Sequence, residues 1–505
     1  MQLHYKWARQ SLFLLSLVIE AFLSHGKVTV FLLLATLVPL IKDKLRCISE
    51  SKNYRSIAMS SLILKLLDWI ILLLFGSSLG VDDLQFAYQP GSSTSMCTWA
   101  AVETINYFLR NGTDVYACLM DMTKAFDLVR HSLLFKKLIG AGLSVIFVRL
   151  LLFIYMNQFA NIRWNGDFSD LFSIKNGVRQ GAILSGILYC FYTNDLFSIL
   201  RRNKTGCWVD NVYMGIFGYS DDNLLVAPSL DSLQEMILTC EQYASEHNLK
   251  FSTNPIPSKC KTKCMALQNK EKEHGDVKLG GVPLPWVEGG LHLGNHIKNS
   301  CKGMTQDIKV KRANFIDKNI TLNQEFHFSH PSTKVKINQI YNLHFTGSVM
   351  WDLFSKEAVM LENSWNTSVR VMFDLPMQTH RNLIEPVSET KHLKFVLLER
   401  FLGFLYQIEK STKTVPKHLL KFIKHDVRSI TGSNLRNLLL LTDKNKIEEL
   451  CKDDIKKMKY QQIEENNVWK VNMIKEITNV KFHKLEVQNF SIEELDEILS
   501  HLCTT

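Results

Sequence analysis

Residues 212–227 read VYMGIFGYSDDNLLVA, with apolar runs on both sides of two adjacent acids. We expect Val212–Phe217 and Asn223–Ala227 to form the strands of a hairpin, with Asp221 and Asp222 at its turn. A DD pair in such a place is often only a solvated turn. The flanking apolar residues, however, indicate a hairpin embedded in a sheet. Adjacent carboxylates repel each other there and persist readily when metal cations neutralise them.

Two other stretches carry chemistry. Residues 117–127 (ACLMDMTKAFD) predict a central strand, Val115–Met120, that delivers Asp121 at its end. Residues 176–186 (NGVRQGAILSG) predict a glycine-punctuated loop that opens a helix over Gly186–Ile199. Each alone has an ordinary explanation, since an Asp after a strand is commonly the N-cap of the next helix.

The surrounding pattern predicts an α+β fold. Elements follow one another in βαββαβ order up to about residue 297, and beyond residue 303 the chain reads as almost wholly helical. The other expected helices cover residues 11–24, 60–76, 95–111, 133–139, 144–155 and 232–247. The other expected strands cover 159–164, 171–174 and 264–268, and residues 31–38 are expected to form a strand or a buried helix.

In this order the stretches resemble the motifs of reverse transcriptases, specifically those of non-LTR (LINE-like, jockey-type) retrotransposons. Asp121–Asp127 looks like motif A, Val178–Ser185 like motif B, and YSDD at 219–222 like the Tyr-x-Asp-Asp of motif C. Four further matches keep the family's order: NYRSI at 53–57 and QFAY at 85–88 resemble fingers elements, FSTNP at 251–255 with Lys259 resembles motif D, and LGN at 293–295 resembles the primer-grip turn.

The resemblance implies a right-hand polymerase with palm, fingers and an all-helical thumb. Its reverse transcriptase domain is expected over residues about 22–300. The expected divisions are an N-terminal extension and fingers over 1–110, a palm over 111–300, a basic helical thumb and post-thumb region over 301–440, and a charged helical C-terminal extension over 441–505.

The implied activity is RNA-directed DNA polymerisation, a nucleotidyl transfer in which a DNA primer 3′-hydroxyl on an RNA template attacks a dNTP. Asp121 and Asp221 are then the main ligands of two Mg²⁺ ions, with Asp222 close by and the Met122 carbonyl completing the shell. Hard oxygen ligands suit Mg²⁺, and Mn²⁺ is a possible substitute.

The resemblance also implies a nucleotide-binding set. Phe126 stands where the family places a ring that clashes with a ribose 2′-hydroxyl; the alternative is a core aromatic. Gln180 and Gly181 are expected against the incoming nucleotide, beside Tyr219. The cations expected to reach the triphosphate are Lys44 and Arg55, and Lys259 is expected to protonate the leaving pyrophosphate; for each, the alternative is a solvated surface charge.

Charge is unevenly distributed along the chain. Its 505 residues carry 59 Lys and Arg against 49 Asp and Glu, a net charge of +10. Residues 301–440 hold 20 basic and 12 acidic residues, whereas 441–505 hold 10 and 13. A basic segment favours a polyanion partner, with a solvated helical face as the alternative. It contains Lys309, Lys311, Arg312, Lys318, Lys334 and Lys336 among aromatics that we expect to be mostly core: Phe315, Phe326, Phe328, Trp351 and Trp365.

Composition limits the cellular context. The 11 cysteines follow no disulfide framework, and Cys260 with Cys264 lacks a second half of zinc spacing, so we expect free thiols. No apolar run reaches the roughly 20 residues of a membrane span. We therefore expect an intracellular protein of the nucleus or cytoplasm, neither secreted nor in a membrane, with no obligatory protein partner evident.

The sequence departs from the family pattern at several points. Gln89 stands where an arginine is usual, Ala87 replaces a glycine, and motif B has Ala182 and Gly186 where Cys or Pro and then Pro are common. There is no room upstream for an endonuclease domain, so we expect a truncated element copy. The alternatives are an inactive remnant that binds RNA or RNA–DNA hybrid, and an RNA-dependent RNA polymerase, which Phe126 disfavours.

Overall fold

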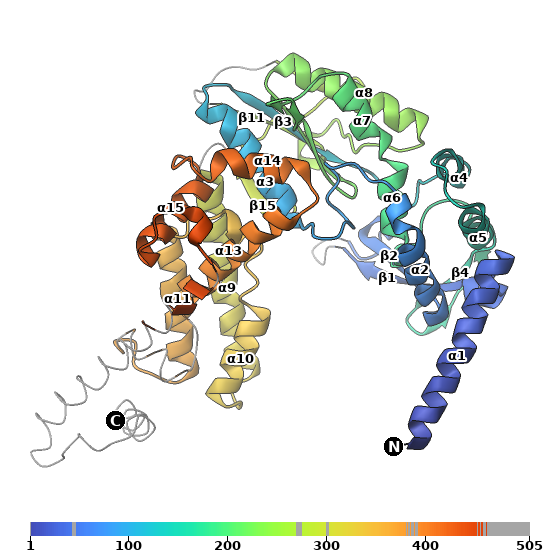
Figure 1. Ribbon diagram of the computed structural model, residues 1–505, viewed down its shortest axis with the longest axis horizontal. Coiled ribbons are helices and arrows are strands. Elements are labelled where there is room, and N and C mark those ends of the chain that lie inside the picture. The colour runs from blue at the N-terminus through green and yellow to red at the C-terminus, as the bar shows by residue number, and fades with distance from the viewer. Residues whose placement is uncertain are drawn as a thin grey trace, which may run out of the picture. The chain divides into compact units, whose positions relative to one another are not determined.

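The computed structural model describes residues 2–42, 47–268, 275–298, 302–379 and 392–451, and single residues at 381, 384, 388, 453, 454, 456, 457 and 461 (Figure 1). The chain divides into two compact units. The first, here the mixed unit, comprises residues 1–97, 115–266 and 273–287. The second, here the helical unit, comprises residues 98–114, 267–272 and 288–505.

A four-stranded sheet forms the centre of the mixed unit, in the order β11-β3-β10-β9. Its strands are β3 (Val115–Asp121), β9 (Ile216–Tyr219), β10 (Asp222–Ala227) and β11 (Lys263–Leu267). The strand β10 is antiparallel to both β3 and β9. Helix α8 (Leu230–Glu246) packs against β3 and β10, as Figure 1 shows. The predicted βαββαβ order and α+β class are therefore confirmed.

A second sheet lies in the same unit and is built from residues far apart in the sequence. Its order is β2-β1-β4-β5, with β6 also paired to β4. The strands are β1 (Leu34–Ile41), β2 (Tyr54–Met59), β4 (Phe159–Trp164), β5 (Asp167–Phe168) and β6 (Phe172–Ser173). Because β1 runs antiparallel to β2 and parallel to β4, this sheet ties the chain's first sixty residues to the segment around residue 160.

Helices and short hairpins complete the mixed unit. The helices are α1 (Gln2–His25), α2 (Leu62–Phe75), α4 (His131–Gly140), α5 (Val145–Met156), α6 (Ser185–Tyr192) and α7 (Asp195–Arg202). Single turns of 3-10 helix are η1 (Val30–Leu33), η2 (Ser51–Asn53), η3 (Gly76–Ser78) and η4 (Pro257–Lys259). The hairpins pair β7 (Trp208–Val209) with β8 (Val212–Tyr213) and β12 (Lys278–Leu279) with β13 (Val282–Pro283). No helix among the described residues is long and apolar enough to cross a membrane.

Among its described residues the helical unit contains one hairpin, β14 (Gly289–His292) with β15 (Asn295–Lys298), whose turn falls at Leu293–Gly294, within the predicted turn at 293–295. Its helices are α9 (Lys302–Glu325), α10 (Pro331–Tyr341), α11 (Lys356–Met372), α13 (Leu393–Lys410), α14 (Thr414–Ile423) and α15 (Ile430–Thr442), with η5 (Ser348–Met350) and η6 (Ile447–Glu449); α3 (Thr94–Arg110) belongs mainly to it. From residue 302 onward every described element is helical, as predicted.

Two predicted elements have different boundaries. Gly186–Ile199 is two helices, because the Asn194 side chain accepts the Asp82 backbone N–H (2.6 Å) and the chain turns there before α7. Val212–Phe217 is not one strand. Val212 and Tyr213 pair with β7 across a turn at Asp210–Asn211, both with positive φ, and a new strand begins at Ile216. Positive φ at both central residues is the requirement of a tight two-residue hairpin.

Helix α2 buries an acid against the loop that precedes α6. Asp68 is 2% exposed and faces Arg179, which is 6% exposed. Burial raises the pKa of Asp68 to about 6, against the lowering effects of Arg179 and of the backbone N–H groups of Leu184 and Ile183. Within the described part of the chain, Asp68 Oδ2 and Arg179 Nε and Nη1 have no hydrogen-bond partner. The surroundings of Asp68 therefore do not fully offset the cost of burying its carboxylate charge.

This raised pKa predicts a pH-dependent stability. The folded protein holds the Asp68 proton more tightly than the unfolded chain, whose pKa is near 3.8. The resulting stabilisation is full below about pH 4 and is lost as the pH rises to about 6, on the order of 3 kcal/mol. Urea unfolding of the native protein and Asp68→Asn between pH 4.5 and 7 should show their free energies of unfolding diverging accordingly. Exposed Asp167→Asn is the control, and a pH-independent difference for Asp68→Asn contradicts the assignment.

Candidate active site

The register of β3 and β10 places two acids opposite each other. Asp222 pairs with Asp121 at the end of both strands, and Asp222 also pairs with Tyr219 of β9. Only Ser220 and Asp221 remain for the turn between β9 and β10, and Ser220 adopts a left-handed conformation (φ 62°). Three carboxylates therefore gather at one end of the central sheet.

Burial and neighbouring acids disfavour the ionisation of Asp221 and Asp222. The pKa of Asp222 is raised to about 6, first by burial and then by the charges of Asp221 and Asp121. Burial, followed by the Asp121 charge, also raises the pKa of Asp221, while hydrogen bonds and Arg55 act in the opposite direction. A desolvated cluster of like charges attracts cations.

Basic side chains lie around the acids. Lys261 Nζ is 3.3 Å from Asp121 Oδ2, and its side chain is 65% exposed. Lys261 and then Arg55 lower the pKa of Asp222. Lys42 belongs to the same group, because burial first and then the charges of Arg55 and Lys261 lower its pKa. The site thus combines three acids with nearby cations that an anionic ligand can attract.

The acids are suitable ligands for magnesium. Their donor atoms are carboxylate oxygens, which Mg²⁺ prefers, and burial with the neighbouring acids raises the pKa of Asp222. Met122, whose carbonyl is the remaining predicted ligand, follows β3 directly and has a buried side chain. Among the described residues, however, no three His, Cys, Asp or Glu side chains converge closely enough to enclose a metal ion by themselves. Substrate oxygens have to supply part of any such shell.

The loop before α6 lies against β2. Ala58 N–H donates to the Gln180 carbonyl (2.8 Å), and Gly181 has φ 106°. A Cβ on Gly181 would meet the Ala58 carbonyl oxygen at 3.2 Å, so glycine permits this close approach. The Gln180 side-chain amide donates to Asp127 Oδ1 (3.4 Å). These contacts bring residues 180–181 to β2 and to the turn that follows β3.

Phe126 lies in the turn that follows β3. Its ring stacks on that of Tyr189 in α6, with centroids 4.9 Å apart and planes 18° apart. Tyr189 is fully buried, whereas Phe126 is half-buried. One face of the Phe126 ring is therefore supported, and the side chain remains accessible from outside the core.

The remaining predicted residues have different surroundings. Tyr219 ends β9 and is half-buried, and burial raises its pKa. Lys259 is exposed in η4. The lysine that contacts Asp121 is instead Lys261, for which the sequence alone gives no signal. Lys44 lies outside the described residues. Lys42, two positions earlier, was also missed, since a single cation has no local signal.

One departure in motif B has a structural explanation. The Tyr88 ring lies against Gly186 at the start of α6, so that a Cβ on Gly186 would come within 2.4 Å of the ring. Tyr88 itself has a positive φ (56°) and is 53% exposed. A proline at residue 186 would fill the space that this ring occupies.

The basic segment is only partly free to meet a polyanion. Lys311 Nζ is 2.8 Å from the buried Asp307 carboxylate, and Arg312 Nε donates to Ser364 Oγ (2.7 Å). Lys309, Lys318 and Lys336 are exposed and Lys334 is half-buried. As expected, most of the aromatics are core: Phe315, Trp351 and Trp365 are buried, while Phe326 and Phe328 are exposed.

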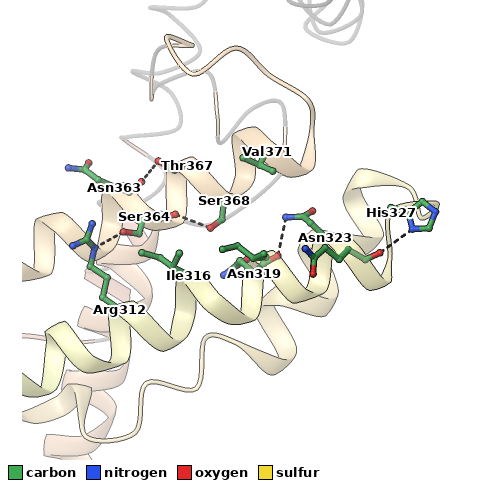
Figure 2. Close-up of a pocket in the computed structure, with 12 residues that line it drawn as sticks. Arg312, Ile316, Asn319, Asn323, His327, Asn363, Ser364, Thr367, Ser368 and Val371 are labelled. Atoms are coloured by element: carbon green, nitrogen blue, oxygen red, sulfur yellow. Dashed lines mark hydrogen bonds between the residues drawn. The ribbon is translucent and has the colours of Figure 1, made fainter.

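The helical unit also has a cavity of about 800 Å³ between α9 and α11 (Figure 2). Amide side chains line one wall, among them Asn319 and Asn323, and hydroxyls of α11 line the other. The hydroxyls are engaged within their own helix: Thr367 donates to the Asn363 carbonyl and Ser368 to the Ser364 carbonyl. Asn319 Oδ1 has no hydrogen-bond partner among the described residues.

Comparison with known proteins agrees with this arrangement. Residues 42–288 match the family described as reverse transcriptase (RNA-dependent DNA polymerase). Over 205 residues the chain is 27% identical to an uncharacterized 149 kDa protein of transposon TX1 from Xenopus laevis, covering 40% of this chain and 16% of that protein. It is 26% identical over 220 residues to a Pol polyprotein of the type-1 retrotransposable element R2 from Bradysia coprophila (44% and 25%). A probable RNA-directed DNA polymerase from the Drosophila melanogaster transposon X-element is 22% identical over 253 residues (48% and 26%).

Among solved structures, telomerase from Candida tropicalis in complex with a fragment of telomeric RNA has 12% identity and a TM-score of 0.39, with 91% of this chain and 68% of that chain covered. A TM-score of this size does not establish a shared fold. The chain spans about a quarter or less of the three retroelement relatives above. Residues 42–288, a little under half of the chain, are therefore similar to a reverse transcriptase domain. Its sequence relatives come from non-LTR retrotransposons.

The position of Lys261 predicts which lysine supports catalysis. Lys261→Ala should lower the rate of single-nucleotide incorporation roughly 10²-fold, because the cation nearest the acids is lost. Lys261→Arg keeps the charge but cannot give up a proton near neutral pH. It should therefore restore nucleotide binding without restoring the rate. Lys259→Ala is the matched control, and a larger effect of Lys259→Ala than of Lys261→Ala contradicts this prediction.

Proposed function

We propose that the chain extends a DNA primer on an RNA template by transferring nucleotidyl groups from dNTPs. The pairing of Asp121 with Asp222 at the sheet end, beside Asp221 in the turn, is the observation that carries this proposal. Phosphoryl transfer requires charge stabilisation and alignment, and no covalent intermediate on the protein. A cluster of acids under a group of cations meets that requirement.

Each group of residues has a role in this mechanism. Asp121 and Asp221, with Asp222 and the Met122 carbonyl, would hold the metal ions. Two Mg²⁺ ions bound there would lower the pKa of the primer hydroxyl and offset charge on the leaving pyrophosphate, and Mn²⁺ is a possible substitute. Arg55, Lys42 and Lys261 neutralise the triphosphate, and Lys261 is the nearest proton donor.

The proposed substrate contacts are supported by the positions of the residues around the acids. Gln180 and Gly181 bound the nucleotide site on the side of β2, and Tyr219 closes the side of β9. The supported Phe126 ring excludes a ribose 2′-hydroxyl, so that dNTPs are preferred. Exposed cations of α9 and α10 bind the phosphate backbone of an RNA template and DNA primer.

The finer family assignment is also a proposal. The R2, TX1 and X-element relatives have similar identities, so a jockey-type origin rests on the order and spelling of the sequence motifs alone. We place the activity inside the cell, in the nucleus or cytoplasm.

Primer extension with Asp221→Asn tests the function. On poly(rA)/oligo(dT) with Mg²⁺, the native protein should incorporate dTTP, and Asp221→Asn should be slower by roughly 10³-fold because a metal ligand has lost its charge. The matched control is Asp210→Asn, an exposed acid in the neighbouring two-residue turn between β7 and β8. It should leave the rate unchanged.

The same assay addresses the inactive-remnant alternative. Folded native protein that binds the hybrid in a filter or anisotropy assay but extends nothing contradicts the proposed polymerase and favours a binding protein. Equal extension by native protein and Asp221→Asn contradicts the role given to the acids. If the native protein extends nothing, Gln89→Arg is the first substitution to test, because it restores the usual fingers arginine.

Removal of the Phe126 ring tests sugar selection. Phe126→Ala should raise the preference for rNTP relative to dNTP by roughly 10- to 100-fold in kcat/KM, because the space for a 2′-hydroxyl opens. Phe172→Ala, a 40% exposed aromatic of β6, serves as the control. Unchanged selectivity of Phe126→Ala would return Phe126 to the role of a core aromatic packed on Tyr189.

A further inference from the structure

A buried glutamine contacts the turn that carries the acidic pair. Gln85 is 0% exposed and lies in the segment between η3 and α3. This segment runs beside β9: Gln85 forms a parallel bridge with Gly218, Phe86 N–H donates to the Gly218 carbonyl (2.8 Å), and Gly218 N–H donates to the Leu84 carbonyl (2.9 Å). The backbone of Gln85 is therefore fixed next to the strand that leads into the turn.

The Gln85 side chain binds both peptide groups of one residue in that turn. Its Oε1 accepts the Ser220 N–H (2.8 Å), and its Nε2 donates to the Ser220 carbonyl (3.2 Å). The same Oε1 also accepts the Ala87 N–H (3.1 Å), which orients the amide. A donor and an acceptor are thus matched to the two groups of Ser220, a pattern that an amide supplies and a carboxylate does not.

Ser220 needs such support because of its conformation. Its φ of 62° is left-handed, which costs a residue with a side chain roughly 1 kcal/mol or more. Ser220 is also 8% exposed, so water cannot readily satisfy its peptide groups. Asp221 and Asp222 follow directly, and any displacement of the Ser220 peptide moves their carboxylates.

We propose that Gln85 is a positioning residue for catalysis: by binding both peptide groups of Ser220 it holds the acidic turn in the geometry that places Asp221 beside Asp121. This inference rests on the proposed polymerase function. Small displacements of reacting groups have large effects on rate, whereas the Gln85 side chain is itself buried and hydrogen-bonded to Ser220 and Ala87. Loss of the Gln85 amide should therefore affect kcat and metal requirement more than substrate binding.

The test uses Gln85→Leu, which has similar volume and removes both hydrogen bonds. We expect kcat to fall at least about tenfold and the Mg²⁺ concentration for half-maximal rate to rise. KM for dTTP and the dissociation constant for primer–template should change less than about twofold. Gln158→Leu is the matched control, since Gln158 is 1% exposed in the same unit and neither polar atom of its side chain has a hydrogen-bond partner among the described residues.

Active-site titration separates positioning from folding. A normal burst amplitude with a slower burst rate in Gln85→Leu supports the inference, while a reduced amplitude with the native rate overturns it, because fewer molecules are then folded. If Gln85→Leu does not fold, Gln85→Glu serves as the second variant. It retains the acceptor for Ser220 N–H but loses the donor to the Ser220 carbonyl, and a native kcat in Gln85→Glu or Gln85→Leu overturns the inference.

Hydrogen exchange provides a readout that does not depend on activity. The Ser220 amide should exchange at least about tenfold faster in Gln85→Leu than in the native protein and in Gln158→Leu. If the native protein extends no primer but this exchange result holds, the proposed function has failed while the contact from Gln85 to the turn stands. Unchanged exchange at Ser220 overturns the inference whatever the activity.

Discussion

The antiparallel pairing of β3 with β10 is the constraint on which the proposed chemistry depends. In this register Asp121 stands opposite Asp222, and the next pairs are apolar or buried. A slip of one residue would turn every side chain of β10 to the opposite face of the sheet. Leu224, Leu225 and Val226 are completely buried, and because successive side chains alternate, both faces of β10 are packed. Such a slip would bring each of these side chains against the wrong neighbours in a close-packed core. Hydrophobic burial therefore fixes the acids in place, although the acids themselves repel one another.

The repulsion between the acids favours the binding of cations beside them. Burial and like charge raise the pKa of Asp222 to about 6, and the lysine nearest the cluster is mostly exposed on a flexible side chain. Such a lysine neutralises an acid when no other cation is present and can leave when one arrives, since an exposed ion pair is worth little. A rigid, buried partner for Asp121 would stabilise the fold more but would compete with a metal ion. The exposure of Lys261 thus favours function at the expense of local stability.

The sequence predicted the features that depend on local periodicity and missed those that depend on distant contacts. The acidic hairpin, the βαββαβ order and the helical second half follow from apolar patterning, and the structure confirms them. The break between α6 and α7 could not be foreseen, because Asn194 is held by an N–H from residue 82. Likewise, nothing in residues 259–261 shows which lysine turns toward Asp121. The roles of the acids, of Phe126 and of the loop at Gln180 remain predictions. The positions of these residues in the structure are compatible with them.

Buried polar side chains in the mixed unit share one physical task. Chemistry at the end of a sheet needs irregular backbone, and irregular backbone leaves peptide groups that no strand or helix partner satisfies. Gln85 supplies those partners for the turn at Ser220, and Asp68 faces the backbone N–H groups of Ile183 and Leu184 where the loop enters α6. Both residues lie on segments that precede α3, more than a hundred positions before the loops they contact. An apolar residue at either position would pack as well but would leave those peptide groups unpaired, so the polar residues are explained by the loops they hold and not by the stability of the core.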